Sequence, residues 1–453
     1  MKDFTPEYLD HLRSVIENHN DDEARKALAD LHPADIAELC DDLGIDESEY
    51  LFTLLSEEAQ ADVLMELDED DRQQLLKNMD AEDIAKQIEH LDTDDAVDII
   101  QEMDADERER VLSHIDDVEQ AGDIIDLLKY DEDTAGGLMG TEMIVVNENW
   151  SMPETIKQMR MQAEDMDEVY YVYVVDNDER LRGTLPLKKL ITHPNVSKIK
   201  HVMETDPASV KVDTPIEDVA LDFEKYDLVA MPVVDQIGRL LGRITVDDVM
   251  DKVRDLSERD YQLASGLSGD VESDDKLFAQ TKARLPWLLI GMVGGLCNSV
   301  ILGRFETGFV VDPALALFIP LIGGTGGNVG TQSSAIVVQG LANGSLDIKK
   351  SGRQLLKELG VGLINGCIIA LLVFIYNWIT IGDGHQVTTF AVSISLFCVV
   401  MFASVFGTFV PLTLEKLKID PALATGPFIS ITNDIIGMLI YMTISSWLII
   451  AFH

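Results

Sequence analysis

The sequence of 453 residues is poor in bases, aromatic residues and cysteine. Lys and Arg number 35 against 81 Asp and Glu, which leaves a formal net charge of −46. So acidic a chain argues against nucleic acid, and against anionic lipid head groups, as partners of its charged part. The cysteines show neither metal-ligand nor redox spacing, so we expect buried free thiols at all four: Cys40, Cys297, Cys367 and Cys398.

The first residues show no signal-peptide pattern, and the sequence shows no enzymatic motif. Its first ten residues, MKDFTPEYLD, contain no basic and no apolar stretch, so we expect no signal peptide there. No ATP-hydrolysing motif occurs, and the central region offers no nucleophile with a nearby base. The absence of these two enzymatic features predicts a protein that is not an enzyme.

The charge is distributed very unevenly along the chain. Residues 1–279 contain 73 of the acids and 26 of the bases, whereas residues 280–453 contain 8 and 9. Holding so many carboxylates in a compact domain causes self-repulsion unless cations screen or bridge them. One remaining acid, Asp434, interrupts the last apolar stretch, where a carboxylate marks an ion or proton pathway by default. The pattern indicates a cation transporter that also senses its cation.

A 12-residue repeat runs through the first region. Apolar residues recur at this interval at Leu31, Leu43, Leu55, Leu67, Met79, Leu91 and Met103. From Leu67 onward an Asp follows the apolar residue, and a second acid lies three residues later, as in a helix capping box: Asp68 and Asp71, Asp80 and Asp83, Asp92 and Asp95, Asp104 and Glu107. Each unit is therefore predicted to be a helix of about two turns. Such helices bury their apolar faces only by stacking, which predicts an acidic all-α solenoid.

A tandem repeat follows the solenoid. Residues 174–191 (VVDNDERLRGTLPLKKLI) align with 233–250 (VVDQIGRLLGRITVDDVM) at a constant offset of 59. Each copy is typical of strand, turn, strand and helix. The pattern resembles a pair of cystathionine-β-synthase (CBS) motifs, an α/β regulatory module that binds ligands or dimerises.

Five apolar stretches fill the C-terminal region. They centre on about 286–303, 313–341, 360–380, 388–412 and 421–452, and their lengths suit membrane-spanning helices. Lys and Arg gather in alternate connecting loops, so the positive-inside rule places the N-terminus in the cytoplasm and the C-terminus outside. A multi-pass protein of the cell membrane is expected.

Two of these stretches contain polar residues. Residues 320–335 of the second (PLIGGTGGNVGTQSSA) are too polar and glycine-rich for a lipid-facing helix; they serve either close helix packing or a water-filled path. In the last stretch, one narrow helical face carries Asp434 as its only charge and consists of Pro427, Ser430, Asp434, Gly437 and Tyr441. No base lies in the middle of another stretch to neutralise Asp434, which argues against a structural ion pair.

Three segments together resemble the MgtE family of magnesium transporters. They are YDEDTAGGLMGTE (residues 130–142), LFIPLIGGTGGNVGTQSSAIVVQGLANG (317–344) and DPALATGPFISITNDIIGMLIY (420–441). The resemblance implies a multidomain membrane protein with a solenoid at 1–128, CBS motifs at 129–200 and 201–252, a connecting (plug) helix at 253–279, and a five-helix transmembrane domain at 280–453.

The resemblance also implies the functional residues. The expected protein is a homodimer whose pore lies on the two-fold axis, with Asp434 as the pore ligand for Mg²⁺ and a pore lining that includes Gly326, Gly327, Asn328, Thr331, Gln332 and Ser430. It implies regulatory Mg²⁺ ligands at Asp94, Asp98, Glu217, Asp227, Asp248, Asp251 and Glu258. An adenine nucleotide is a further candidate ligand of the CBS pair. The chain departs from the family on the connecting helix, where Leu256 and Arg259 replace two acids.

The sequence thus predicts a Mg²⁺ channel that conducts into the cytoplasm and is closed by cytosolic Mg²⁺. A cation sensor with a mere membrane anchor is one alternative, but it leaves the polar second stretch and Asp434 unexplained. An intramembrane aspartyl protease would need a second facing carboxylate. A proton-coupled carrier is the third alternative.

Overall fold

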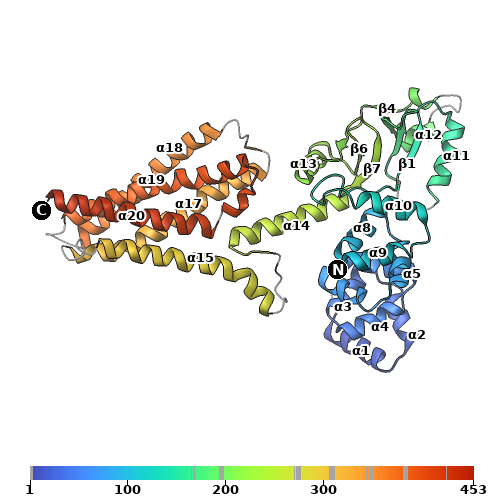
Figure 1. Ribbon diagram of the computed structural model, residues 1–453, viewed down its shortest axis with the longest axis horizontal. Helices are drawn as coiled ribbons and strands as arrows, with labels where there is room; N and C mark the ends of the chain where they lie inside the picture. Colours follow the sequence, from blue (N-terminus) through green and yellow to red (C-terminus); the bar gives the residue numbers. More distant parts are fainter. Residues whose placement is uncertain are drawn as a thin grey trace. The chain divides into compact units, whose positions relative to one another are not determined.

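The computed structural model describes residues 4–164, 166, 169–192, 198–269, 271, 277–305, 312–342, 345–346, 351–380, 386–424 and 426–452. Two compact units make up the chain, Met1–Val253 and Arg254–His453, and each is considered by itself. Figure 1 shows the elements of both units with their labels.

The first unit begins with a succession of short helices, as the 12-residue repeat predicts. They are α1 (Pro6–Glu17), α2 (Asp21–Leu28), α3 (Pro33–Asp41), α4 (Ile45–Thr53), α5 (Glu57–Glu66), α6 (Glu69–Leu76), α7 (Ala81–Ile88), α8 (Thr93–Glu102), α9 (Ala105–Leu112) and α10 (Val118–Leu127). Alternate helices pack on one another, α3 on α5, α5 on α7, and α7 on α9. The predicted all-α solenoid is confirmed.

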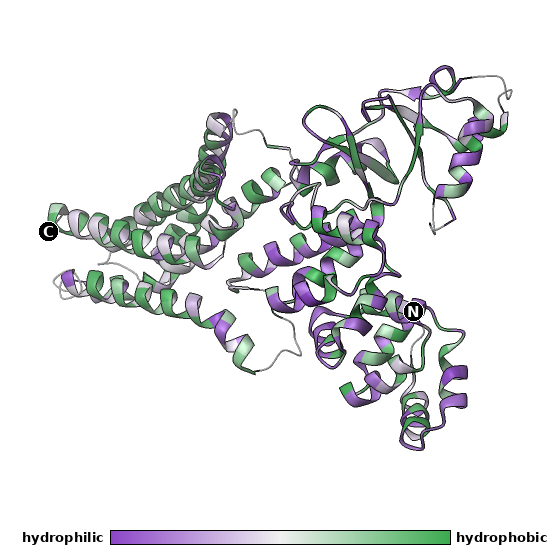
Figure 2. Cartoon of the chain, turned by 45° about the vertical axis from the view of Figure 1, so that its right-hand side comes forward, coloured by the Kyte–Doolittle hydropathy of each residue, from purple (hydrophilic) through white to green (hydrophobic). Residues whose placement is uncertain are grey.

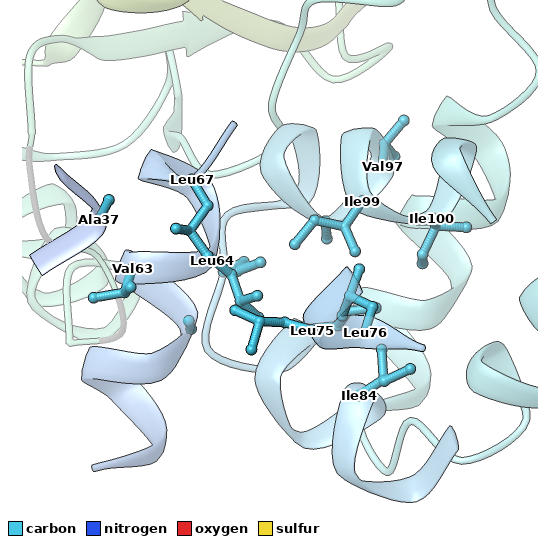
Figure 3. Packing of buried hydrophobic residues seen from close by; sticks show 14 of the residues in the cluster. Ala37, Val63, Leu64, Leu67, Leu75, Leu76, Ile84, Val97, Ile99 and Ile100 are labelled. Carbon is cyan, nitrogen blue, oxygen red and sulfur yellow. The ribbon is translucent and has the colours of Figure 1, made fainter. Parts of the chain in front are cut away.

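The apolar residues of the repeat form one continuous core. Figure 3 shows Leu64, Leu75 and Ile84 converging with Ile99 and Ile100 from successive helices. Ile99 and Ile100 have no exposed surface, so each short helix is stabilised by its neighbours and not by its own length.

The capping expectation is correct for some units and wrong for others. Asp80 and Asp104 accept hydrogen bonds from helix N–H groups, at 3.0 Å from Asp83 and 2.9 Å from Glu107. Asp68 and Asp92 occupy the same N-cap position without capping their helices. Asp92 instead pairs with Arg243, whose Nη2 lies 3.1 Å from Asp92 Oδ2.

Polar side chains spaced by multiples of 12 residues cap the opposite helix ends. Gln60, Arg72 and Arg108 each donate to a carbonyl oxygen eight residues earlier, of Phe52 (2.8 Å), Leu64 (3.2 Å) and Ile100 (3.1 Å) respectively. They satisfy carbonyls that lack a partner inside the helix. The repeat therefore specifies the connections as well as the core.

The remainder of the first unit contains two small mixed sheets. The first is β1 (Ile144–Asn147), β2 (Val172–Val175), β3 (Leu181–Leu185) and β4 (Glu204–Thr205); the second is β5 (Val210–Lys211), β6 (Ala230–Val234) and β7 (Leu240–Thr245). Helices α11 (Met152–Gln162), α12 (Leu187–Thr192) and α13 (Ile216–Tyr226) accompany them.

The two sheets repeat one another in detail. The β2–β3 register shifts between Val174 and Val175, and the β6–β7 register shifts between Val233 and Val234, 59 residues later. Asp176 and Asp235, also 59 apart, accept the N–H groups of Arg180 and Arg239 at the two turns. The predicted α/β repeat is confirmed.

Helix α14 (Val246–Ser265) starts directly after β7 and ends before Gly266, whose φ of +82° suits glycine at a helix C-terminus. The sequence places the end of the second CBS motif at residue 252 and a connecting helix at 253–279. Instead, one helix runs through residue 252, because the run from Val246 contains no residue that would break it.

The second unit contains the helices that can cross a membrane. They are α15 (Leu277–Arg304), α17 (Ile319–Ala342), α18 (Ser351–Thr380), α19 (Gln386–Lys416) and α20 (Pro427–Phe452), with 3₁₀ turns η2 (Pro313–Phe318) and η4 (Pro421–Ala424). The cartoon in Figure 2 shows that hydrophobic residues predominate along these helices. Helices α17, α19 and α20 pack against each other, α18 packs on α19, and α15 packs on α20. The five predicted spans are confirmed.

The cysteines differ in part from the expectation. All four are free thiols, but only Cys40 is buried, while Cys297 and Cys367 are exposed and Cys398 is intermediate. The prediction of burial was wrong for these three because an apolar residue of a membrane helix can face outward, toward lipid, as readily as inward.

Candidate functional site

Asp434 lies on α20 directly opposite the glycines of α17. A Cβ atom on Gly327 would lie 3.2 Å from Asp434 Oδ1 and 2.8 Å from Ser430 Oγ, and one on Gly323 would lie 3.7 Å from Asp434 Oδ1. Only glycine allows the two helices to approach so closely. Within the described part of the chain, Asp434 Oδ1 is buried without a hydrogen-bond partner. The carboxylate is thus available to an external ligand.

The predicted pore lining divides between two faces of α17. Gly326 and Gly327 are buried, and Gly326 faces Val399 of α19. Asn328 and Gln332 are exposed on another face, and the Thr331 hydroxyl donates to its own helix, at 3.1 Å from the Gly327 carbonyl oxygen. Exposed amides on a membrane helix are poorly suited to lipid. This face therefore needs water or another protein surface.

A further polar residue beside Asp434 was missed in the sequence. Asn433 is 1% exposed, and both polar atoms of its amide lack partners among the described residues. It fills the space left by Gly330, where a Cβ would lie 1.8 Å from Asn433 Nδ2. The signal was present as a second polar residue next to Asp434 in an apolar stretch.

The first unit contains a compact group of acids that we name the acid cluster: Asp92, Asp94 and Glu142. These residues offer carboxylate oxygens within 4.8 Å of one another. Asp92 and Asp94 lie at the start of α8, and Glu142 precedes β1. The N–H of Thr93 donates to Glu142 Oε1 at 3.0 Å, and that of Thr141 donates to Thr93 Oγ1 at 2.9 Å. These two bonds hold residues 141–142, which precede β1, against the N-terminus of α8.

More acids surround the acid cluster. Burial raises the pKa of Asp94 well above its usual range, and the charge of Asp248 raises it further. Burial likewise raises the pKa of Asp95 to about 7, again with Asp248 contributing. Burial raises the pKa of Asp98 to about 6, against the opposing effects of Lys252 and Arg72. A dication bound here would relieve this mutual repulsion.

Arg243 is the base that contacts the acid cluster. Its Nη2 lies 3.1 Å from Asp92 Oδ2, its Nε donates to the Glu142 carbonyl oxygen, and its side chain is 12% exposed. Its backbone N–H and C=O both pair with Gly140 at 2.9 Å. This role was not predicted from the sequence. The one available signal was that Arg243 stands where the first copy of the repeat has Thr184, 59 residues earlier.

Comparison with known proteins identifies the family. The model of MgtE, a divalent cation transporter, matches residues 319–444, the MgtE intracellular N domain matches 31–133, and the CBS domain matches 135–195 and 199–255. A magnesium transporter MgtE of Thermus thermophilus is 36% identical over 330 residues, covering 71% of this chain and 72% of that protein. One of Enterococcus faecalis is 34% identical over 328 residues, 72% of either chain. The chain belongs to the MgtE family.

As a member of the MgtE family, the protein is a Mg²⁺ transporter and not an enzyme. It is a multi-pass membrane protein with an intracellular N domain. A crystal structure of the cytosolic domain of the Mg²⁺ channel MgtE in complex with ATP is similar at 32% identity and a TM-score of 0.51, covering 54% of this chain and 99% of that one.

The structure gathers only some of the residues that the MgtE resemblance implies as regulatory ligands. The charge of Asp248 raises the pKa of Asp94 and also that of Asp98, which lies one turn further along α8. Among the described residues the acid cluster is the group of three metal-ligand side chains that lie close together, and Glu217, Asp227, Asp251 and Glu258 do not belong to it. Glu258 instead pairs with Arg254 at 3.1 Å.

Proposed function

We propose that the protein is a Mg²⁺-selective channel that conducts Mg²⁺ into the cytoplasm and is closed by cytosolic Mg²⁺. One observation carries the pore assignment: Asp434 Oδ1 is buried without a partner beside Gly323 and Gly327 of α17. A dication is driven inward by about 4.6 kcal/mol at −100 mV, so conduction needs no other energy source.

A homodimer is the proposed conducting form. Asn328 and Gln332 are exposed on α17 in the single chain, and a second copy around a shared aqueous path would cover them away from lipid. Two Asp434 carboxylates could then hold a hydrated Mg²⁺ through its water molecules, which Mg²⁺ releases reluctantly. The N-terminus is proposed to lie in the cytoplasm and the C-terminus outside.

The acid cluster is proposed to sense cytosolic Mg²⁺. Its carboxylate oxygens are hard donors of the kind that Mg²⁺ prefers, and Asp248 at the start of α14 adds another. Mg²⁺ would join the solenoid, the 140–142 linker and α14 by bridging these residues. Without it, carboxylate repulsion would favour a looser arrangement.

The C-terminal end of α14 supports a route from this sensor to the pore. Within the second unit, a Cβ on Gly426 would lie 2.0 Å from the Ala264 carbonyl oxygen, and one on Gly266 would lie 2.5 Å from Pro427 Cγ. Pro427 begins α20, the helix that carries Asp434. A shift of α14 would therefore be transmitted to α20, and Mg²⁺ binding that favours one position of α14 would favour the closed pore.

An adenine nucleotide is the proposed second ligand of the CBS pair. The support is the ATP bound to the similar cytosolic domain. In this chain, Tyr170, Tyr171, Tyr173 and Arg243 line a small hollow together with Glu142, and this hollow would have to widen to admit a nucleotide. The Arg243 guanidinium lies 5.9 Å from the Tyr170 ring centre, so the hollow offers both an aromatic face and a positive charge.

The pore proposal is tested with the full-length protein in planar bilayers. Asp434→Asn keeps the side-chain size and removes the charge, so Mg²⁺ current should fall at least about a hundredfold while the melting temperature changes little. Glu415→Gln, which removes a charge near the end of α19, is the matched control and should conduct like the parent. An Asp434→Asn channel with parental current would exclude Asp434 as the pore ligand, and current that requires a pH gradient would indicate a proton-coupled carrier.

A further inference from the structure

Glu358 is an intramembrane acid that the proposed pore does not use. It lies two turns into α18, and its side chain is 7% exposed. Ser333 Oγ of α17 donates to Glu358 Oε1 at 2.6 Å, and both side chains are buried. Acids within membrane helices are costly and are retained mainly for function.

The packing of α18 on α19 allows this carboxyl group to reach α17. A Cβ on Gly362 would lie 3.0 Å from Ser404 Cβ, and one on Gly366 would lie 3.0 Å from Phe397 Cδ2. These small residues bring α18 close to α19. Glu358 lies one turn before Gly362 and extends past α19 to Ser333.

Helix α17 is otherwise held by contacts that involve its glycines. Gly326 faces Val399, Gly327 faces Ser430, and a Cβ on Gly407 would lie 2.3 Å from the Gly330 carbonyl oxygen. These contacts set the distance between the helices, and Asn433, which fills the space left by Gly330, together with the buried Ile322 already limits the rotation of α17. Within the described residues, Ser333–Glu358 is the side-chain hydrogen bond that joins α17 to another helix. Because a hydrogen bond is directional, it adds a constraint on the rotation of α17 that apolar packing does not supply.

The rotation of α17 decides where its exposed amides face. Gln332 and Asn328 lie about 100° and about 140° around the helix from Ser333, at about 3.6 residues per turn. Both are exposed in the single chain. If the helix turned, both amides and the surface opposite Asp434 would move together.

We infer that Glu358 is a positioning residue for cation selectivity: by binding Ser333 it helps to fix the rotation of α17 and so directs Asn328 and Gln332 at the passing cation. The inference rests on the proposed function only in that α17 lines the cation pathway. It assigns a role to an acid that touches neither the ion nor Asp434.

The test measures the Mg²⁺/Ca²⁺ permeability ratio of the full-length protein from reversal potentials. Glu358→Leu and Ser333→Ala should each lower the ratio at least about fivefold, and the double substitution should lower it no further, because both remove one interaction. Glu358→Gln keeps an oxygen that accepts from Ser333 and should retain the parental ratio. Asn377→Leu is the matched control: this residue is also on α18, is 1% exposed, and its amide has no partner among the described residues.

Three results would overturn the inference: an unchanged ratio in Glu358→Leu, singles whose effects multiply in the double substitution, or an equal loss in Asn377→Leu. If Glu358→Leu does not fold, the test rests on Ser333: Ser333→Ala should lower the permeability ratio, and Ser333→Thr, which keeps the hydroxyl, should retain it. Parental selectivity in both Glu358→Leu and Ser333→Ala, with a silent Asp434→Asn channel, would reject this inference and leave the proposed pore intact. Parental current in Asp434→Asn would reject the pore ligand, whatever the Glu358 variants do.

Discussion

The two compact units each contain carboxylates suited to Mg²⁺, but in opposite surroundings. In the first unit, Asp92, Asp94 and Glu142 lie together among further acids, with Arg243 against one of them. In the second unit, Asp434 stands alone between helices, and glycine backbone forms the opposite surface. Because Arg243 already balances part of the charge of the acid cluster, Mg²⁺ can dissociate and rebind there over a range of concentrations. A lone carboxylate such as Asp434 has no neighbouring acid that could take over its role. We therefore expect graded effects from the first unit and all-or-none effects from the second.

After the loss expected in Asp434→Asn, the largest effect is expected from adding one methyl group beside Asp434. In Gly327→Ala the new Cβ would crowd Ser430 Oγ and Asp434 Oδ1, and overpacking of about 1–3 kcal/mol should lower Mg²⁺ current about tenfold or more. The matched control is Gly324→Ala, because a Cβ there meets no atom within 4 Å. Equal currents from the two variants in bilayer recordings would show that the close approach of α17 and α20 is unimportant.

A second prediction removes charge from the acid cluster. Asp94→Asn with Glu142→Gln should raise the cytosolic Mg²⁺ concentration for half-closure by about tenfold, without changing the open-channel current. The control is Asp106→Asn with Glu109→Gln, which removes equal charge from exposed positions on α9. Inside-out patches give both quantities, and the same midpoint in the two double variants would exclude the acid cluster as the sensor.

A third prediction replaces the cation already in the cluster. Arg243→Met removes a positive charge that competes with Mg²⁺ for Asp92, so closure should occur at about threefold lower Mg²⁺, as expected for a pair that solvent partly screens. The control is Arg239→Met, whose partner Asp235 lies outside the acid cluster. A rise in the midpoint would mean that Arg243 supports the metal-bound state.

The smallest effect is a pH dependence confined to the first unit. Burial raises the pKa of Asp95 to about 7 and that of Asp98 to about 6, whereas an unfolded Asp titrates near about 3.9. The folded state then binds more protons than the unfolded state between these values, so its free energy of unfolding falls as pH rises from about 4 to about 7. The hydrogen-exchange protection factors of α8, which correct for the intrinsic effect of pH on exchange, should fall over this range in EDTA and much less in millimolar Mg²⁺. Equal exchange with and without Mg²⁺ would contradict metal binding there.

Much of the fold could be predicted because its signals are local. The 12-residue repeat gives short helices because capping and apolar positions recur within single turns, and the offset of 59 gives two copies down to matching register shifts. The five membrane helices follow from length and hydropathy. The end of the second CBS motif was less visible, since α14 continues through residue 252 without a breaking residue.

The candidate sites were predictable only in part. Asp434 stands out by itself, because one charge in an apolar stretch needs no neighbour to be noticed. Glu142 of the acid cluster and Arg243 beside it did not stand out in the sequence, since each belongs to a segment that has an ordinary structural explanation. Glu358 was overlooked because it follows the basic loop that precedes α18, although its carboxyl group is buried.

The sequence by itself determined the order of the domains, the solenoid repeat, the membrane spans and the isolation of Asp434, because spacing along the chain encodes each of these. Only the tertiary structure decided which distant groups meet: Asp92 with Arg243 across 151 residues, Thr93 with Glu142 across 49, and Ser333 with Glu358 across 25. Periodicity fixes which side of a helix a residue occupies, but the packing of one element on another decides what lies opposite it. In this protein the packing of the elements on one another creates the acid cluster and holds α17 in place.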